Sequence, residues 1–235
     1  MFGGRMMERA RQIGLIPVEL KVLYHDLARL LQRSYSATSA DAANCYDRVH
    51  HIIMALLLWA LGMPIGPIAA MLLTIAFMRY YIRTGFGEST TFMGGEKATA
   101  KMHGLNQGNR ATSHCWSILS ALLVLIQRKR GHIATITTPI SRIISTVMGL
   151  LYVDDTDLFI FDAAIEMPHE LWLRSQAALS SWGTLLIGTG GAAKPDKSWS
   201  YSCISIGMTL DNGVTSISQI MGIISRFPRR MDWKR

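Results

Sequence analysis

Two adjacent carboxylates, Asp154 and Asp155, interrupt the apolar stretch LLYVDDTDLFIF (150–161). At an effective dielectric near 20, two like charges about 4 Å apart repel by roughly 4 kcal/mol, and partial burial adds a desolvation cost. The runs on either side, 149–153 and 158–161, have the length and the aromatic and β-branched content of strands, so the acids fall at a hairpin tip. A solvated turn explains them simply, since Asp is a common turn residue. A divalent cation site explains them too, because Mg²⁺ prefers carboxylate oxygens.

A third carboxylate, Asp41, directly follows YSATSA (35–40), a short run of small and β-prone residues that predicts a strand. If this strand pairs beside the hairpin, three carboxylates converge at one sheet edge and can hold two Mg²⁺ ions, with Mn²⁺ as a substitute. Such a pair of ions activates an attacking hydroxyl and stabilises a leaving pyrophosphate in phosphoryl transfer. Taken alone, Asp41 is explained better by an ordinary turn at a strand end than by a metal site.

Composition limits the class of protein. The 235 residues are 49% hydrophobic, which is enough for a substantial core. The formal charge is +8 and the pI about 9.7, which favours a polyanion such as nucleic acid, or an acidic membrane surface. The three cysteines are widely spaced without a C-x-x-C pair, and the first residues, MFGGRMMERARQIG, contain no apolar segment. We therefore expect an intracellular protein, in the nucleus or cytoplasm, that is not secreted and has no structural zinc.

The elements expected around these acids predict an α+β fold, an antiparallel sheet with helices packed on one face. The stretch from Ile52 to Met78 has no charged residue, but GMPIGP (62–67) interrupts it, which indicates two short buried helices better than a membrane span. A membrane protein stays open as an alternative. Helices are predicted over 5–31 in two pieces, 48–61 with Asp47 as N-cap, 67–81, 110–128 and 168–188. A hairpin or loop is predicted over 83–101 and a last strand over 198–206, and the tail after 211 has no assignment.

Four segments in order resemble the palm motifs of reverse transcriptases encoded by retroelements: DAANCYDR (41–48), GLNQGN (104–109), YVDD (152–155), and GTGG (188–191) with KPDK (194–197). The resemblance covers about Thr38 to Tyr201. It implies a polymerase palm at 35–210, a helical remnant of the fingers region at 1–34, and an unassigned tail at 211–235. The members place a fingers region before the first acid and a thumb after the palm, so we expect other domains or subunits to supply both.

The resemblance also implies site residues. Asp41, Asp154 and Asp155 are the metal-binding carboxylates, and Val153 contributes its backbone to the same turn. Tyr46 lies under the incoming sugar and excludes a 2′-hydroxyl, so deoxynucleotides are preferred; ordinary core packing is the alternative for this ring. The loop that touches the template and the incoming base contains Gln107 and Gly108, and Lys197 lies near the leaving pyrophosphate.

These residues imply an RNA-directed DNA polymerase whose partners are an RNA or DNA template with a primer and deoxynucleoside triphosphates, with no membrane. Two other functions stay open. A nucleic-acid-binding remnant would keep the basic surface without turnover. An RNA-directed RNA polymerase would carry a second acid near the first motif, a pattern that Asp47 comes close to satisfying.

Overall fold

The computed structural model describes residues 19–31, 33–43, 45–95, 104–106, 110–137, 140–152, 155–161, 168–209 and 215–226. The chain divides into two compact units. Unit 1 consists of Met1–Ala42, Leu123–Thr184 and Ala193–Arg235, and unit 2 of Ala43–Leu122 and Leu185–Ala192. These units are defined by contacts within the chain, whereas the fingers, palm and tail predicted from the sequence are defined by resemblance to a family. The predicted boundaries therefore stay a prediction.

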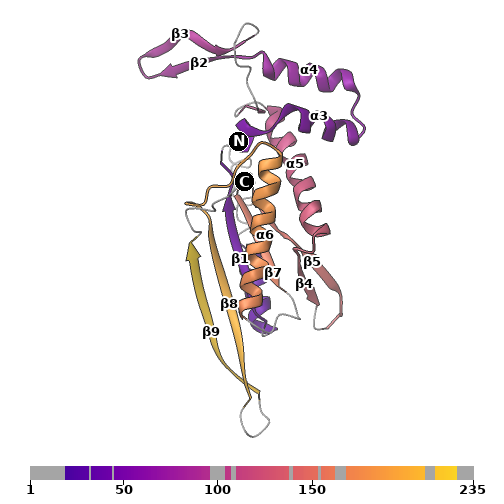
Figure 1. Ribbon diagram of the computed structural model, residues 1–235, viewed down its shortest axis with the longest axis vertical. Helices are drawn as coiled ribbons and strands as arrows, with labels where there is room; N and C mark the ends of the chain where they lie inside the picture. Colours follow the sequence, from indigo (N-terminus) through magenta and orange to yellow (C-terminus); the bar gives the residue numbers. More distant parts are fainter. Residues whose placement is uncertain are drawn as a thin grey trace, which may run out of the picture. The chain divides into compact units, whose positions relative to one another are not determined.

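Unit 1 is built on a five-stranded sheet in the order β6-β7-β1-β8-β9, and each neighbouring pair is antiparallel (Figure 1). The antiparallel α+β architecture predicted from the sequence is therefore confirmed, although helices pack on both faces of the sheet and not on one alone. The two central strands, β1 and β7, are those whose ends carry the predicted acids. The strands are β1 (Tyr35–Asp41), β6 (Gly149–Tyr152), β7 (Asp155–Phe161), β8 (Trp199–Thr209) and β9 (Thr215–Arg226).

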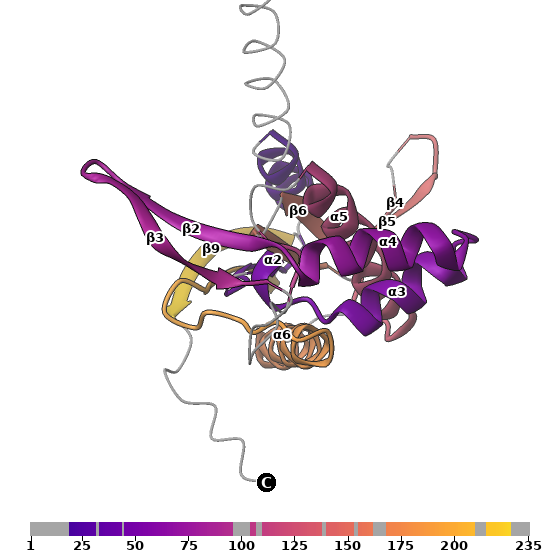
Figure 2. The same cartoon turned by 90° about the horizontal axis from the view of Figure 1, so that it is seen from above.

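The two faces of this sheet are covered by different helices. Side chains alternate along a strand, and Ile160 of β7 packs on one face against Leu171 and Ala178 of α6 (Pro168–Gly188). On the other face Tyr35 and Phe159 form a core with a helix over residues 19–30. Figure 2 shows this indigo helix and the orange α6 on opposite sides of the strands. Asp41 and Asp155 lie an even number of residues from Tyr35 and Phe159, so they belong to the face of the 19–30 helix.

Further elements of unit 1 complete this arrangement. The α5 helix (Arg110–Lys129) packs on α6, where the buried Gln127 donates its Nε2–H to the Ala178 carbonyl at 3.1 Å. A short hairpin of β4 (Ala134–Thr137) and β5 (Ile144–Val147) adds Ala134 and Ile136 to the core. The predicted helices 110–128 and 168–188 are confirmed, whereas the sequence analysis missed the β4–β5 hairpin.

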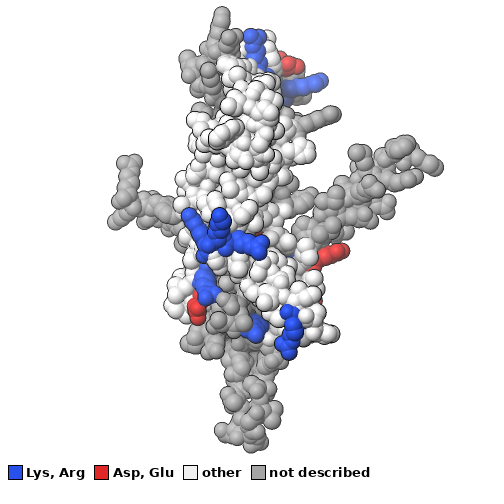
Figure 3. Space-filling model, turned by 90° about the vertical axis from the view of Figure 1, so that its right-hand side faces the viewer, with Lys and Arg blue, Asp and Glu red and all other residues white. Residues whose placement is uncertain are grey.

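Unit 2 contains α2 (Cys45–Arg48), α3 (His51–Ala60), α4 (Ile65–Ala76) and a hairpin of β2 (Arg79–Thr84) and β3 (Gly87–Gly94). The predicted interruption at 62–67 is confirmed, because α3 and α4 are separate helices of 10 and 12 residues. None of the helices in the described part of the chain combines the length and the apolar character needed to cross a membrane. Figure 3 shows a broad area without charged side chains, as expected for a sequence with no charge from Ile52 to Met78.

The predicted single helix over 48–61 with Asp47 as N-cap is wrong. The chain forms α2, leaves the helix at Val49, and starts α3 after His50, whose backbone is extended (φ −66°, ψ 126°). Contacts with residues far along the chain impose this break. The His50 N–H donates to the Thr189 carbonyl at 3.0 Å, and Gly190 lies so close that a Cβ there would come within 2.1 Å of the Arg48 carbonyl oxygen.

The other boundaries differ by smaller amounts. The predicted helix over 67–81 starts at Ile65 and ends at Ala76, because β2 begins at Arg79. The last predicted strand, 198–206, extends as β8 to Thr209, and the unassigned tail contains β9. All three cysteines are buried and form no disulfide, and burial raises the pKa of the Cys115 and Cys203 thiols.

Candidate functional site

The sheet brings two of the three predicted acids together. Asp41 is the last residue of β1, Asp155 is the first of β7, and the two are direct partners in the antiparallel register. Directly opposed residues on one face have Cβ atoms about 4.5–5.5 Å apart, so the two carboxylates can share a cation. Tyr152 of β6 is also paired with Asp155. Asp154 and Val153 follow Tyr152 in the sequence and lie outside the described residues.

Gly149 fixes the position of the hairpin that carries the acids. A Cβ at this position would lie 2.1 Å from the carbonyl oxygen of Asp157 and 3.2 Å from the Cα of Leu158, both in the facing strand. Real Cβ atoms do not approach backbone this closely, so only glycine allows β6 and β7 to pack as they do. The Phe159 N–H then donates to the Met148 carbonyl at 2.9 Å, which extends the pairing between the two arms of the hairpin.

Two lysines compensate the charge of Asp41. The Nζ atoms of Lys194 and Lys197 both lie 3.8 Å from its Oδ2 atom. The role predicted for Lys197, near the leaving pyrophosphate, stays a prediction, and no role was predicted for Lys194. The spacing of two lysines in KPDK (194–197) is the signal that could have found it, because a tight turn brings both ammonium groups to one side.

Backbone hydrogen bonds hold this lysine turn against Asp41. The Lys194 N–H donates to the Asp41 carbonyl at 2.9 Å, and Ala193 forms a β-bridge with Ala42. The Ser198 hydroxyl donates to the Lys194 carbonyl at 2.7 Å and accepts the Asp41 N–H at 3.3 Å. The turn therefore continues the sheet beyond the end of β1, and Asp41 is fixed on both its N–H and its carbonyl.

Asp157, a further acid on the face that carries Asp41 and Asp155, was not predicted. It lies two residues after Asp155 and is buried, and its carboxylate is paired with the Nζ of Lys21 from the 19–30 helix. The register places Asp157 opposite Ser39, and both residues line a cavity of about 340 Å³ together with Lys21 and Trp199. The salt bridge of Asp157 could be found only from the fold, because Lys21 is far away in the sequence.

In unit 2, Tyr46 and the start of the GLNQGN loop contact each other. The Leu105 N–H donates to the Tyr46 carbonyl at 2.7 Å, and the Tyr46 ring packs edge to face on Trp116 with centroids 6.0 Å apart. A Cβ on Gly104, which has φ +88°, would come within 2.3 Å of the Asp47 backbone. The ring therefore makes the core contact that was the alternative for Tyr46, and its role at a sugar stays a prediction.

The loop leads directly into the N-terminal turn of α5. The Thr112 hydroxyl lies 2.7 Å from the Leu105 carbonyl and 2.8 Å from the Asn106 carbonyl, to either of which it can donate. Asn106 has a positive φ of 61°, a conformation that Asn tolerates better than most residues. Gln107 and Gly108, the predicted contacts to template and base, lie outside the described residues.

The residues present suit a hard divalent cation. Aspartate oxygens on adjacent strands are the donors that Mg²⁺ and Mn²⁺ take, and Asp41 and Asp155 are in direct register. Among the described side chains, which do not include Asp154, no three His, Cys, Asp or Glu residues form a metal-binding group. The predicted third ligand is thus untested, and the assignment of metal ligands stays a prediction.

Comparisons with known proteins give a likeness of fold. The chain is similar to the telomerase of Candida tropicalis in complex with a TWJ fragment of telomeric RNA, with a TM-score of 0.50 and 11% identity over 84% of this chain and 31% of that chain. It is also similar to the telomerase of Candida albicans in the same kind of complex (TM-score 0.45, 13% identity, 78% of this chain and 29% of that chain). No protein-family model and no curated protein matches the sequence.

At these identities the likeness shows the fold alone, and only the first of the two structures reaches a TM-score of 0.5. The chain spans about a third of the length of the telomerase chains that it matches. The fold of the chain is therefore similar to that of the part of the Candida tropicalis telomerase that it matches.

Proposed function

We propose that the chain is a reverse-transcriptase palm that adds deoxynucleotides to a primer on an RNA or DNA template by a two-metal mechanism. The observation that supports this most is the pairing of Asp41 with Asp155, because it joins the first and third motifs of the resemblance across adjacent strands. Asp154, next to Asp155, would complete the metal-binding carboxylates, and Val153 would contribute its backbone. The retroelement origin and an intracellular location rest on the sequence alone.

Each predicted site residue would have its own role in this reaction. The three aspartates would hold two divalent ions, Mg²⁺ or Mn²⁺, which activate the primer hydroxyl and stabilise the leaving pyrophosphate. Lys197, whose Nζ lies 3.8 Å from the Asp41 carboxylate in this structure, would move to the leaving pyrophosphate and donate a proton to it. Tyr46 would exclude the 2′-hydroxyl of a ribonucleotide, and Gln107 and Gly108 would contact the template and the incoming base.

The partners of this reaction are a template–primer duplex and deoxynucleoside triphosphates. A net charge of +8 suits a polyanionic duplex, because each lysine or arginine that neutralises a phosphate releases a counterion. Since the chain spans about a third of the telomerase chains, we also propose that other domains or subunits supply the fingers and thumb. Most phosphate contacts would then come from those parts.

A nucleic-acid-binding remnant without turnover is the second candidate, and the same excess of positive charge favours it. Primer extension with Mg²⁺ and labelled deoxynucleotides separates the two. We expect extension by the wild-type chain, none by the Asp154→Ala, Asp155→Ala double variant, and unchanged extension by Lys129→Gln, which removes one exposed charge at the end of α5. Equal binding of the duplex by all three proteins without extension would support the remnant.

A further inference from the structure

The Lys194 and Lys197 contacts with Asp41 raise a question about any cation that binds there. Both ammonium groups lie 3.8 Å from the same oxygen, Oδ2, and the Asp41 side chain is only 13% exposed. A divalent ion would bind a carboxylate oxygen at about 2.0–2.1 Å, closer than either ammonium group, and both positive charges would repel it. The ammonium groups and the ion therefore compete for Asp41.

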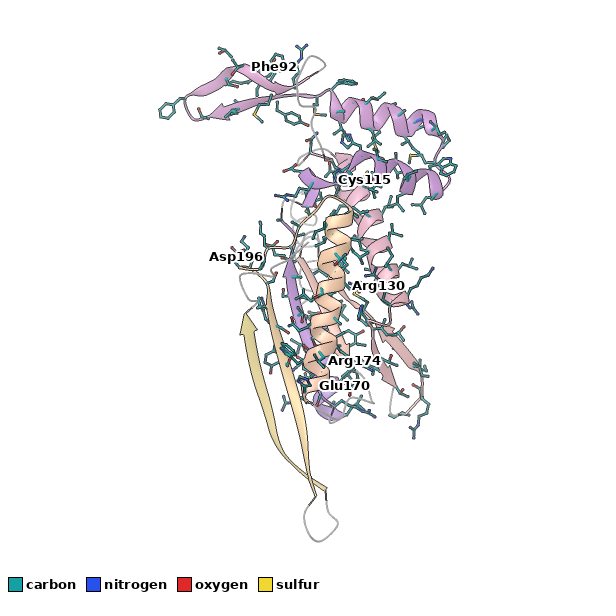
Figure 4. All side chains as sticks on the ribbon, in the orientation of Figure 1. Phe92, Cys115, Arg130, Glu170, Arg174 and Asp196 are labelled. Carbon is teal, nitrogen blue, oxygen red and sulfur yellow. The ribbon has the colours of Figure 1, made fainter. Side chains whose placement is uncertain are left out.

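The lysine turn is built into the fold. Lys194 is fixed by its own N–H and carbonyl, which bond to the Asp41 carbonyl and the Ser198 hydroxyl. Lys197 is kept in place by a tight turn in which its N–H donates to the Lys194 carbonyl at 3.2 Å. Figure 4 labels Asp196 on this turn, just before β8. The backbone thus holds both lysines within reach of Asp41, and only the side chains have to move.

The contacts of Lys194 and Lys197 with Asp41 are looser than that of Lys21 with Asp157. Lys21 is in direct contact with a buried carboxylate, whereas two ammonium groups share Asp41 at 3.8 Å. The side chains of Lys194 and Lys197 are 33% and 63% exposed, so their flexible, strongly hydrated ammonium groups can move into solvent. The charge of Asp41 is then still compensated, provided that another cation binds there. The pairing of Asp41 with Asp155 favours a cation beside Asp41, because two opposed carboxylates repel each other.

We propose that Lys194 and Lys197 are resting counter-ions of Asp41, and that a divalent cation binds by displacing their ammonium groups from its carboxylate. This inference rests on the metal site of the proposed function. It assigns Lys194 a role in positioning charge that the sequence motif did not suggest. It also implies that both lysines are released when the metal binds, so that the acid edge of the sheet is compensated in either state.

Titration of the purified full chain with Mn²⁺, without nucleotide or duplex and followed by electron paramagnetic resonance, tests the displacement. We expect Mn²⁺ to bind about threefold to tenfold more tightly to the Lys194→Gln, Lys197→Gln double variant, a change in the range that two exposed ion pairs can contribute. Lys129→Gln, which removes the same charge elsewhere in unit 1, should stay within twofold of wild type. Unchanged or weaker binding by the double variant would overturn the inference.

Amine modification followed by mass spectrometry gives an independent readout. Mg²⁺ should increase the rate at which Lys194 and Lys197 are acetylated in the wild-type chain, and Asp41→Asn should make that rate high with or without Mg²⁺. Protection of either lysine by Mg²⁺ would contradict the displacement.

The Asp41→Asn variant also separates this inference from the proposed function. If that variant binds Mn²⁺ as well as wild type does, the metal site is wrong and both proposals fail. If it binds Mn²⁺ poorly while the lysine variants behave as wild type, only the displacement fails.

Discussion

Replacing Gly149 by alanine tests whether the close pairing of β6 with β7 holds the acidic end of β7 in place. The new Cβ would lie 2.1 Å from the Asp157 carbonyl oxygen, while ordinary van der Waals contact begins at 3.4 Å, so the strands must separate by about 1.3 Å. A separation of that size would stretch the 2.9 Å bond from the Phe159 N–H to the Met148 carbonyl to about 4 Å, beyond hydrogen-bonding distance. Overpacking costs about 1–3 kcal/mol and a lost hydrogen bond about 1 kcal/mol.

We therefore expect Gly149→Ala to lower the free energy of unfolding by about 2–4 kcal/mol, measured by urea denaturation followed by circular dichroism. Because Asp155 lies in β7, beside the strand that would be displaced, Mn²⁺ affinity should fall as well. Gly183→Ala is the matched control. Gly183 lies in α6 with no atom within 4 Å of a built Cβ, so alanine should stabilise the chain by about 0.5–1 kcal/mol. A loss below 0.5 kcal/mol for Gly149→Ala would refute the steric reasoning.

Three further substitutions test other parts of the structure. Lys21→Met should lower the free energy of unfolding by about 1–2 kcal/mol, because it leaves the buried Asp157 carboxylate without its cation. In a double-mutant cycle, adding Asp157→Asn to Lys21→Met should restore at least half of that loss, and additive effects of the two substitutions would show that the pair is not coupled. Gly104→Ala should cost about 2–4 kcal/mol in chemical denaturation, since its Cβ would clash with backbone at a positive φ, whereas Gly85→Ala, where space is open, should stay within 0.5 kcal/mol. Burial lowers the pKa of His132 below 6.5, so on acidification the unfolded chain binds this proton before the folded chain does. The free energy of unfolding should therefore fall as the pH drops below about 6.5. His132→Gln should weaken this fall, and an unchanged dependence of stability on pH would contradict the reasoning.

The elements that the sequence predicted well are those whose pattern is local. The α6 helix has its predicted bounds, 168–188, and α5 ends one residue beyond its prediction, because the periodicity of a long helix and its flanking loops can be read from neighbouring residues. The hairpin around Asp154 and Asp155 was predicted from its apolar flanks, and β6 and β7 confirm its two strands.

The elements that the sequence missed depend on distant contacts. The break at His50 comes from residues 189 and 190, and nothing near His50 in the sequence indicates it. Likewise, the charge of Asp157 is compensated by Lys21 and that of Asp41 by Lys194, pairs that only the folded sheet brings together. The β4–β5 hairpin is built from four-residue strands, which are too short to give a clear alternation.

Iron-directed backbone cleavage tests most directly whether the acids form one metal site, since Fe²⁺ in place of Mg²⁺ generates hydroxyl radicals that cut the chain close to the bound ion. The pairing of Asp41 with Asp155 predicts two sets of cuts in the wild-type chain, one around residue 41 and one around residues 153–155. Excess Mg²⁺ and the Asp41→Asn substitution should suppress both sets together. Cuts around only one of the two segments, or cuts that Asp41→Asn leaves unchanged, would contradict a shared site.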